Sequence, residues 1–373
     1  MKTYKFSAEN TEFITELRKE VKEYFTKNKL QQYGNYRIII KSVVMTVLYF
    51  VPYGLMVSGL VPSVWMSLLA WFLMGIGMAG LGMVTMHDAN HNSFSGNKNV
   101  NRWVGKSLYL LGGFPPNWRF QHNTLHHGYT NIDGQDEDIA HVGVLRFSPH
   151  QPLKGVHKYQ YLYAWLLYSL MTISWITAKD FKRFSQYKSQ QAPLSDKSYN
   201  QLFTELLLSK VVYYTLFLIL PLIIIPFAWY WILAGFLLMH LTGGFILTII
   251  FQTAHVVPTS EYPLPDGEGR MDNSWAIHQL HTTADFAPDS KLLSWYIGGL
   301  NYQIEHHLFP NISHVHYKAI SGLVQKAAQK HGVPYYVNKS FFKALVEHGR
   351  MLKLLGKIDL VKAPVPVQVG LAV

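Results

Sequence analysis

The chain of 373 residues contains no cysteine. Disulfides, thiolate nucleophiles, zinc–thiolate sites and iron–sulfur clusters are therefore excluded. Charged residues are also scarce, because Asp, Glu, Lys and Arg make up 15% of the chain, compared with roughly 25% in a typical soluble domain. Hydrophobic residues make up 49%, so the composition points away from an ordinary soluble protein.

Two stretches contain no charged residue at all, and they cover residues 42–87 and 211–260. A helix that spans a bilayer needs about 20 mostly apolar residues, so each stretch is long enough for two spans. Turn-forming residues at 61–63 and 226–230 predict that each stretch enters the membrane and returns. We therefore expect an all-α membrane protein with four transmembrane helices, arranged as two hairpins with a helical cytoplasmic cap.

Basic residues outnumber acidic residues by 33 to 22, which gives a formal net charge of +11. Both predicted turns lie in charge-free sequence, so every charged residue can stay on one side of the membrane. Segments rich in Lys and Arg stay in the cytoplasm, where anionic lipid head groups attract them. The charge therefore predicts cytoplasmic termini and a cytoplasmic catalytic face, and it requires no nucleic-acid partner.

This topology divides the chain into five segments. An amphipathic cytoplasmic leader (1–41) precedes the first hairpin (42–87). A cytoplasmic segment (88–210) connects it to the second hairpin (211–256), and a second cytoplasmic segment (257–373) completes the chain.

Histidines gather just outside the charge-free stretches. His87 and His91 are four residues apart, which on a helix places both rings on one face, and His122 and His126 repeat this spacing. Imidazole is the usual neutral ligand for iron, zinc and copper. The candidate metal ligands are His87, His91, His122, His126, His127, His255, His306 and His307.

Two pairs of adjacent histidines favour two ions. The side chains of neighbouring helical residues diverge by about 100°, so His306 and His307 should serve different metals. Eight histidines are also too many for one structural zinc site, which takes four ligands. The ligand type alone leaves iron, zinc, copper and manganese open, but two redox metals at a membrane surface suit oxygen activation. Gln303, four residues before His307, is a further candidate ligand.

Polar residues near these clusters are candidates for supporting the ligands. Metal-bound imidazoles usually donate their second N–H to a carboxylate or a carbonyl group. For Glu137, which follows the second cluster, a solvated acidic loop is an equally good interpretation. The residues to which we assign the supporting role are Asp88, Asp136, Asp138, Glu305 and His281.

Residues 159–178 form another charge-free stretch of spanning length. A fifth span there would place the last histidine cluster on the opposite side of the membrane from the first two. The stretch also contains four tyrosines and several hydroxyl residues. We therefore predict that it lies in the membrane interface as a helix.

Three motifs resemble those of the membrane fatty acid desaturases. They read HDANH from His87, HNTLHHGYTNIDGQDED from His122 and NYQIEHHLFP from Asn301, in the order and at separations similar to those of that family. The resemblance covers most of the chain. It implies four membrane helices, a cytoplasmic cap and a non-haem di-iron centre held by the eight histidines. The second motif has three residues between His122 and His126, where many relatives have two, and this bears on which ring faces which iron.

Glutamine at position 303 resembles the front-end subgroup, whose members insert a double bond between an existing one and the carboxyl end. The bacterial linoleoyl-CoA or delta-6-type desaturases are similar, which implies a bacterial inner membrane. The resemblance leaves open whether Gln303 binds an iron directly or through water.

The resemblance also implies a set of cofactors and partners. These are two iron ions, O2 as co-substrate, and a fatty acyl chain linked to coenzyme A or to a membrane lipid. The His-Pro-Gly-Gly motif of the cytochrome b5 domain found in many front-end enzymes is absent, so electrons should come from a separate ferredoxin or cytochrome b5 and its reductase. Arg119, Lys182 and Arg183 are candidates for binding head-group phosphates, although positive-inside topology explains them equally well.

Other functions use similar residues. A lipid or alkane hydroxylase with the same metals would add an oxygen atom to its product instead of removing two hydrogens. A metal transporter would need ionisable residues inside the spans, where His240 alone lies well inside. A haem protein with two histidine ligands would show a Soret band. Residues 75–80 match GxGxxG, but no strand precedes them, so close helix packing explains these glycines better.

Overall fold

The computed structural model describes residues 3–140 and 143–358. The described residues are mostly helical, which confirms the all-α prediction, and their strands form two short parallel pairs. β1 (Lys5–Phe6) pairs with β2 (Arg270–Met271), and β3 (Ala284–Phe286) pairs with β4 (Tyr336–Asn338). The first pair joins the leader to the carboxy-terminal segment.

Four helices in the described part of the chain are long and apolar enough to cross a membrane. The first is α2 (Tyr36–Val57), and the fourth is α12 (Trp229–His255). The second is continuous through α3 (Val64–Gly80), the π-helix η1 (Leu81–Met86) and α4 (His87–Asn90). The third is continuous through α10 (Tyr199–Tyr214), the π-helix η7 (Thr215–Ile219) and α11 (Leu220–Ile224).

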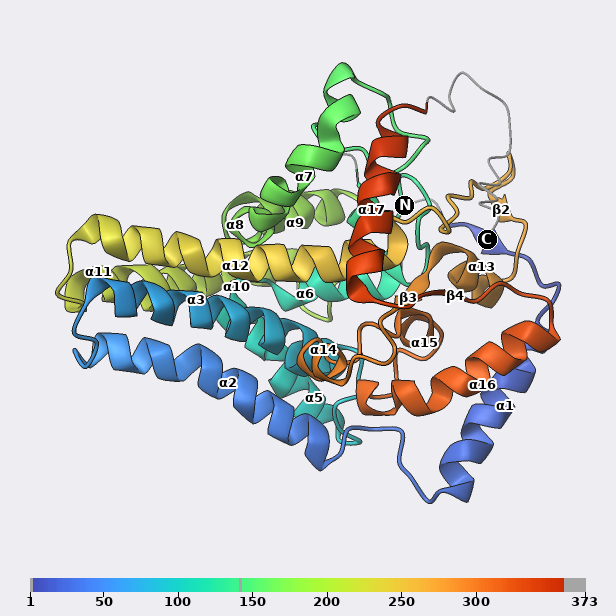
Figure 1. Ribbon diagram of the computed structural model, residues 1–373, viewed down its shortest axis with the longest axis horizontal. Helices are drawn as coiled ribbons and strands as arrows, with labels where there is room; N and C mark the ends of the chain where they lie inside the picture. The colour runs from blue at the N-terminus through green and yellow to red at the C-terminus, as the bar shows by residue number, and fades with distance from the viewer. Residues whose placement is uncertain (1–2, 141–142, 359–373) are drawn as a thin grey trace.

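Short connections join these helices in pairs. Residues 58–63 lie between α2 and α3, and residues 225–228 lie between α11 and α12. Both connections are at the left end of the molecule in Figure 1 and overlap the predicted turns. Ser63 starts α3 because its side chain accepts a hydrogen bond from the Met66 N–H. That the pairs cross a membrane as hairpins below a cytoplasmic cap stays a prediction.

The third long helix begins at Tyr199, earlier than the predicted start at residue 211. Ser198 and Gln201 form a capping box at its amino-terminal end, which satisfies free backbone N–H groups. Lys210, whose charge set the predicted boundary, lies inside the helix. Its ammonium group is 2.6 Å from the Asp180 carboxylate and donates to the Gly112 carbonyl. A charged side chain can thus lie within a long apolar helix when an opposite charge is paired with it.

Glycines let α3 pack closely against both neighbouring long helices. A Cβ atom on Gly75 would lie 2.6 Å from the Met239 carbonyl oxygen on α12, and a Cβ atom on Gly77 would lie 2.7 Å from the Tyr49 nitrogen on α2. Both distances are shorter than van der Waals contact. The glycines of the 75–80 motif thus serve helix packing, as the sequence indicated.

Shorter helices gather around one end of the long ones (Figure 1). α1 lies beside α16, and Phe13, Leu17 and Val21 of α1 are buried in a cluster with residues of α16. The remaining elements are α1 (Glu12–Lys27), α5 (Lys98–Gly105), η2 (Lys106–Leu111), α6 (Pro115–Arg119), η3 (Phe120–His126), η4 (Glu137–Ile139), η5 (Gly155–Tyr159), α7 (Gln160–Ser169), α8 (Met171–Ser174), η6 (Trp175–Lys179), α9 (Asp180–Ser189), α13 (Trp275–Thr282), α14 (Lys291–Tyr296), α15 (Gln303–Leu308), η8 (His314–His316), α16 (Tyr317–Lys330) and α17 (Phe341–Leu355).

The stretch 159–178 is not one of the four long apolar helices. It breaks at Leu170 into α7 and α8 and packs against α12, where the Ser169 carbonyl approaches Gly244. Leu162 and Leu166 on α7 are 61% and 70% exposed. An outward apolar face on a helix too short to span agrees with interfacial placement, which remains a prediction.

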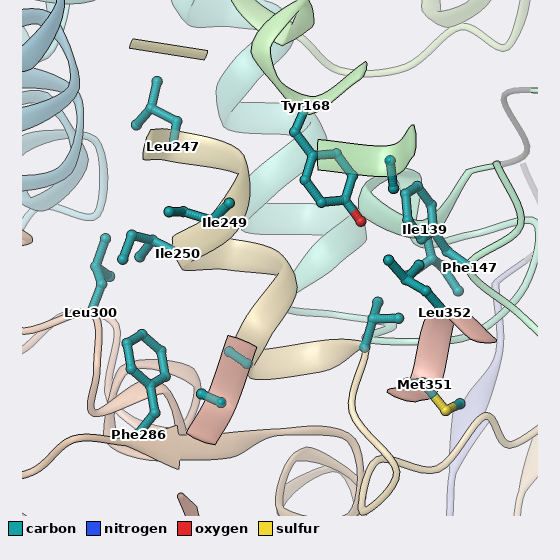
Figure 2. Close-up of a cluster of buried hydrophobic side chains, with 14 of the residues drawn as sticks. Ile139, Phe147, Tyr168, Leu247, Ile249, Ile250, Phe286, Leu300, Met351 and Leu352 are labelled. Atoms are coloured by element: carbon teal, nitrogen blue, oxygen red, sulfur yellow. The ribbon is translucent and has the colours of Figure 1, made fainter. Parts of the chain in front are cut away.

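A large hydrophobic cluster fixes the end of α12 within the surrounding elements (Figure 2). Ile249 and Ile250 of α12 meet Tyr168 of α7, Phe286 of β3 and Leu352 of α17 in this cluster. Because α12 ends at His255, the cluster fixes the position from which that histidine projects.

Candidate metal centre

Seven of the eight candidate histidines form two compact groups in the described structure. The first group contains His87, His91, His122 and His306, and the second contains His126, His255 and His307. Within each group, the nitrogen atoms available for coordination lie within 4.8 Å of one another, and every side chain is buried. The groups combine residues from α4, η3, α12 and α15 and the residue after α4. The fold therefore brings together rings that are more than 200 residues apart in sequence.

The adjacent histidines of the third cluster belong to different groups. His306 is in the first group and His307 is in the second, and their ring planes are 84° apart. Their assignment to different groups agrees with the prediction from helical geometry. The two groups lie side by side, because the rings of His122 and His126 are 5.3 Å apart between centroids. Two neighbouring groups can hold two ions.

The second cluster lies on a π-helix, where the sequence predicted α-helical spacing. In η3 the His127 N–H donates to the His122 carbonyl, five residues earlier, at 3.0 Å. This wider turn brings the Nε2 atoms of His122 and His127 to 3.2 Å. His122 and His126, which the spacing placed on one face, therefore fall in different groups, and His122 contacts His127. π-Helical turns inside α-helices occur frequently at functional sites.

His127 belongs to neither of the two groups, but it lies between them. Its ring is 4.6 Å from the ring of His306 and 4.4 Å from the ring of His307, measured between centroids. It is buried like the others. Its position against both groups is compatible with a ligand role for either ion.

Each histidine of the second group donates its Nδ1–H away from the group. His126 donates to Asp136 at 3.1 Å, His255 donates to the Thr282 carbonyl at 3.2 Å, and His307 donates to Gln279 at 2.8 Å. In a neutral imidazole, a proton on Nδ1 leaves a lone pair on Nε2. These hydrogen bonds therefore turn three Nε2 acceptors toward a common point, as in many metal sites.

Several of these inward nitrogens are buried without any hydrogen-bond partner among the described residues. They are the Nε2 atoms of His91, His255, His306 and His307. A buried polar atom without a partner costs roughly 1–3 kcal/mol, so four of them in one place require an explanation. A bound cation supplies one, because each lone pair would then coordinate metal. The residues present thus fit two ions with nitrogen ligands.

Burial sets the protonation states of these rings. Removal from water and the neighbouring histidines hold the pKa of His122, His306 and His307 well below the usual value. Burial also lowers the pKa of His126, but the Asp136 and Asp138 carboxylates outweigh it and raise that pKa to about 9. Neutral imidazole is the form that binds metal, so most of the cluster is already in the ligand form at neutral pH.

Of the acidic residues predicted to support the ligands, some contact a candidate ligand and others do not. Asp136 accepts from His126 with both oxygens at 3.1 Å, and Asp138 is 3.5 Å from the same nitrogen. Asp88 accepts from Ser313 and from His314, which is outside both groups. The Asp88 carboxylate therefore joins α4 to residues 313–314 instead of accepting from a candidate ligand.

Glu305 and His281 have partners other than a candidate ligand. Glu305 accepts from the Tyr335 hydroxyl at 3.0 Å, and burial beside Asp285 raises its pKa well above the usual value. His281 is 2.7 Å from the Glu261 carboxylate at the surface. Their placement does not bring either side chain into the two groups. Gln303 is buried beside His255, and its Nε2 atom lacks a hydrogen-bond partner among the described residues.

The three basic residues predicted to bind a head group also differ in placement. Arg119 donates from Nε to Asn90 at 2.7 Å, and Arg183 is paired with Glu137 at 2.9 Å. Lys182 is exposed. Two of the three cations are therefore already engaged within the protein.

The sequence did not single out the residues that orient several of the rings. Gln279 accepts from His307, the Thr282 carbonyl accepts from His255, and the Tyr317 hydroxyl lies 3.1 Å from His306 Nδ1. These are ordinary polar residues outside the histidine clusters, so no spacing or motif marked them. Thr282 acts through its backbone, which no side-chain pattern can reveal.

An apolar cavity opens beside the first group. It extends from Met78, within the second long helix, past His87 and His122 to Glu137 in η4. Polar residues Gln121, Asp138 and Lys179 also line it. The apolar wall consists mainly of Met78, Met86, Leu111, Trp118, Met171, Trp175, Leu247 and Phe251. An elongated apolar ligand could therefore lie directly against the candidate metal ligands.

Comparisons with known proteins agree with this site. The family model described as "Fatty acid desaturase" matches residues 63–339. The chain is 33% identical over 343 residues to an sn-1 linoleoyl-lipid 6-desaturase of Synechocystis sp., covering 91% of this chain and 94% of that protein. It is 33% identical to the protein of the same name from Arthrospira platensis, over 91% and 92% of the two chains. It is 34% identical to an acyl-lipid (8-3)-desaturase of Physcomitrium patens, over 94% and 72%.

Proposed function

Because this chain belongs to the fatty acid desaturase family, we propose that it introduces a cis double bond near the carboxyl end of a polyunsaturated acyl chain at a di-iron centre. It is a membrane enzyme of the oxidoreductase class that acts on a fatty acyl substrate. The observation that carries the di-iron proposal is the outward Nδ1–H of His126, His255 and His307, which leaves their Nε2 lone pairs directed at one point.

The two groups of histidines would hold one iron each, with His127 between them. Their ligands would all be imidazole nitrogens, a donor type that suits iron. When bound, the irons would supply O2 activation by two electrons, which the removal of hydrogens from an unactivated methylene pair requires. Gln303 would hold His255 or a water molecule at the second group, because its amide is buried at that ring.

The apolar cavity would position the acyl chain. Its wall passes His87 and His122, so a bound chain would present particular carbons to the metal centre. Displacement by one carbon would change the product, because reaction requires the reacting atoms to be in contact. Trp118 stacks on His122 with the ring centroids 4.5 Å apart, and both side chains line the cavity, so the indole would contact the acyl chain beside the centre.

Two observations favour a front-end enzyme. Gln303 takes the place of a histidine in the third motif, as in the front-end subgroup that the sequence resembles. The similar proteins are also named for desaturation at position 6 of a linoleoyl lipid and for (8-3)-desaturation of an acyl lipid. We propose that electrons arrive from a separate ferredoxin or cytochrome b5 and its reductase. The proposed site is a bacterial inner membrane, with the metal centre and both termini in the cytoplasm.

Expression in a bacterial host that is supplied with linoleate and an electron donor tests this proposal. Fatty-acid analysis should show a new species two mass units lighter than linoleate, with its new double bond on the carboxyl side of the existing ones. His126→Ala should abolish this species, whereas His331→Ala, which removes a histidine that contacts Glu16 at the surface, should retain it. An unchanged lipid profile, or a product heavier by one oxygen atom, would contradict the proposal.

A further inference from the structure

Trp275, the first residue of α13, connects the protein surface to a candidate metal ligand. Its indole N–H donates to the His127 carbonyl at 2.9 Å, and the residue is partly exposed. The ring of His127 lies against both groups of histidines. The indole is therefore separated from the candidate metal centre by one hydrogen bond and the covalent bonds of a single residue.

The side chains that bond to the neighbouring rings lie deeper in the protein. Tyr317, Gln279 and Asp136 each contact one candidate ligand and are at most 1% exposed. Among the described residues, Trp275 is the one aromatic side chain that both donates to a candidate ligand and reaches the surface. A partner protein could therefore touch Trp275 but not the other three.

Three further aromatic residues lie near Trp275. The ring of Tyr129 is 6.3 Å from that of Phe6 and 6.0 Å from that of Tyr4, measured between centroids. Phe6 also packs at 5.1 Å on His278, which is one turn after Trp275 in α13. Tyr4, Phe6, Tyr129 and Trp275 are all partly exposed, and we call these four residues the aromatic patch.

The place and composition of the aromatic patch suit contact with a soluble protein. α13 lies toward the right end of the molecule in Figure 1, whereas the short connections between the long helices are at the left end. In the predicted orientation the patch therefore faces the cytoplasm. Tyr and Trp are enriched in protein interfaces and supply much of their binding energy, and electron-transfer complexes use small contact surfaces.

The charge of the chain indicates the charge of such a partner. The formal net charge is +11, and residues 42–87 and 211–260 contribute none of it. The predicted cytoplasmic surface is therefore positive overall, and Lys5, which precedes Phe6 in β1, is exposed. A positive surface attracts an acidic protein and speeds its association.

We propose that the aromatic patch is the docking surface for an acidic one-electron carrier, and that electrons enter the metal centre through Trp275. This inference rests on the proposed desaturase function and adds the place at which its electron donor acts. Each docking event would oxidise one carrier molecule and deliver one electron. Two electrons and two protons, with the two hydrogens taken from the acyl chain, reduce O2 to two molecules of water, so the patch would be used twice for each double bond.

The test uses the purified, iron-loaded full-length enzyme and two probes, a plant-type ferredoxin and cytochrome b5. Calorimetry with the oxidised probe gives Kd without any electron transfer, and stopped-flow absorbance without O2 gives the rate at which the reduced, bound probe is oxidised. We expect at least one probe to bind and to be oxidised, with slower association as ionic strength rises. Trp275→Leu should raise Kd by about tenfold or more, as for an interface hot spot.

Trp275→Phe separates docking from electron entry. It keeps an aromatic ring in the patch but removes the N–H that donates to His127. We expect a Kd close to that of the unmodified enzyme and a several-fold slower oxidation of the bound probe. A general structural defect would not separate these two quantities. Trp103→Leu is the matched control, because this tryptophan is 69% exposed on α5 and lies outside the patch, and it should change neither.

Two results would overturn this inference. One is a failure of both probes to bind at low ionic strength, and the other is an equal Kd and an equal oxidation rate in Trp275→Leu and the unmodified enzyme. Enzyme that is fully reduced with dithionite before O2 is admitted needs no carrier, so its single turnover of a linoleoyl lipid tests the desaturase function separately. Absence of a new double bond there would overturn the proposed function and this inference together.

Discussion

At the scale of single residues, a histidine is oriented for metal binding when another group accepts a hydrogen bond from its second nitrogen. Asp136 does this for His126, and Gln279 does it for His307. Such partners fix both the proton and the orientation of the ring, and their loss typically weakens metal binding without removing a ligand. The supporting residues are therefore as open to test as the ligands themselves.

Asp136→Asn keeps the size of the side chain but removes the charge that accepts from His126. We expect the affinity for iron to fall by roughly 10- to 100-fold, measured as iron retained per chain after dialysis against graded chelator concentrations. Asp196→Asn is the matched control, because Asp196 is exposed and distant from the histidine motifs in sequence. Equal iron retention by the two variants would show that Asp136 does not support the centre.

The spacing of the histidines was enough to predict that the clusters converge, because helical geometry and the order of the spans constrain their positions, but it did not predict that His122 and His126 fall in different groups. Their partners could not be predicted in the same way. Gln279 and Tyr317 are ordinary polar residues whose proximity to His307 and His306 arises only from tertiary packing. Proximity in sequence can also mislead. Glu305 precedes two candidate ligands, but its carboxylate accepts from the Tyr335 hydroxyl.

At the scale of secondary-structure elements, helix packing and helix type determine where the ligands lie. The π-helix η3 brings His127 to His122, and α-helical spacing alone would not predict it. The charge of Lys210 is likewise accommodated inside α10 by its contact with Asp180, which is 30 residues away in sequence. Charge-free length therefore predicted the four long helices, while their exact form depended on partners distant in the chain.

The close contact of α3 with α12 can be tested with a matched pair of glycines. Gly75→Ala places a methyl group against the Met239 carbonyl, whereas Gly54→Ala on α2 meets nothing within 4 Å. We expect Gly75→Ala to lower the free energy of unfolding by about 1–3 kcal/mol through overpacking. Gly54→Ala should leave it unchanged or raise it by up to about 1 kcal/mol. Thermal unfolding in detergent measures both, and equal midpoints would contradict the packing account.

The interfacial placement of α7 can be tested directly because the chain has no cysteine. We expect a fluorophore on Leu166→Cys to be quenched by brominated lipid in nanodiscs, since Leu166 is 70% exposed on an apolar helix face. The same fluorophore on Gln325→Cys, an exposed position on α16, should be unaffected. Similar quenching at the two positions would rule out this assignment.

At the scale of the whole molecule, the account requires that all histidine clusters lie on one side of the membrane. The structure supports this by bringing residues of α4, η3, α12 and α15 into contact. We expect the four long apolar helices to cross the membrane an even number of times, which would keep both termini on the side of the proposed metal centre. The charge distribution of the sequence predicts that this side is the cytoplasm.

Membrane sidedness follows from labelling single cysteines with a membrane-impermeant maleimide. Leu60→Cys lies in the connection between α2 and α3 and is exposed. This position should therefore be labelled in spheroplasts, whose inner membrane is intact. Gln325→Cys should react only after the inner membrane is opened. The reverse pattern, or labelling of both cysteines while the inner membrane is intact, would refute the predicted orientation.

The central claim is that two irons are held jointly by histidines from distant parts of the chain. Metal analysis of the purified enzyme, combined with Mössbauer spectroscopy after growth on ⁵⁷Fe, tests it most directly. We expect two irons per chain in non-haem sites, with His126→Ala and His307→Ala each reducing the iron content. Protein that is correctly folded and active as a desaturase but contains zinc, a single iron or no metal would contradict the account.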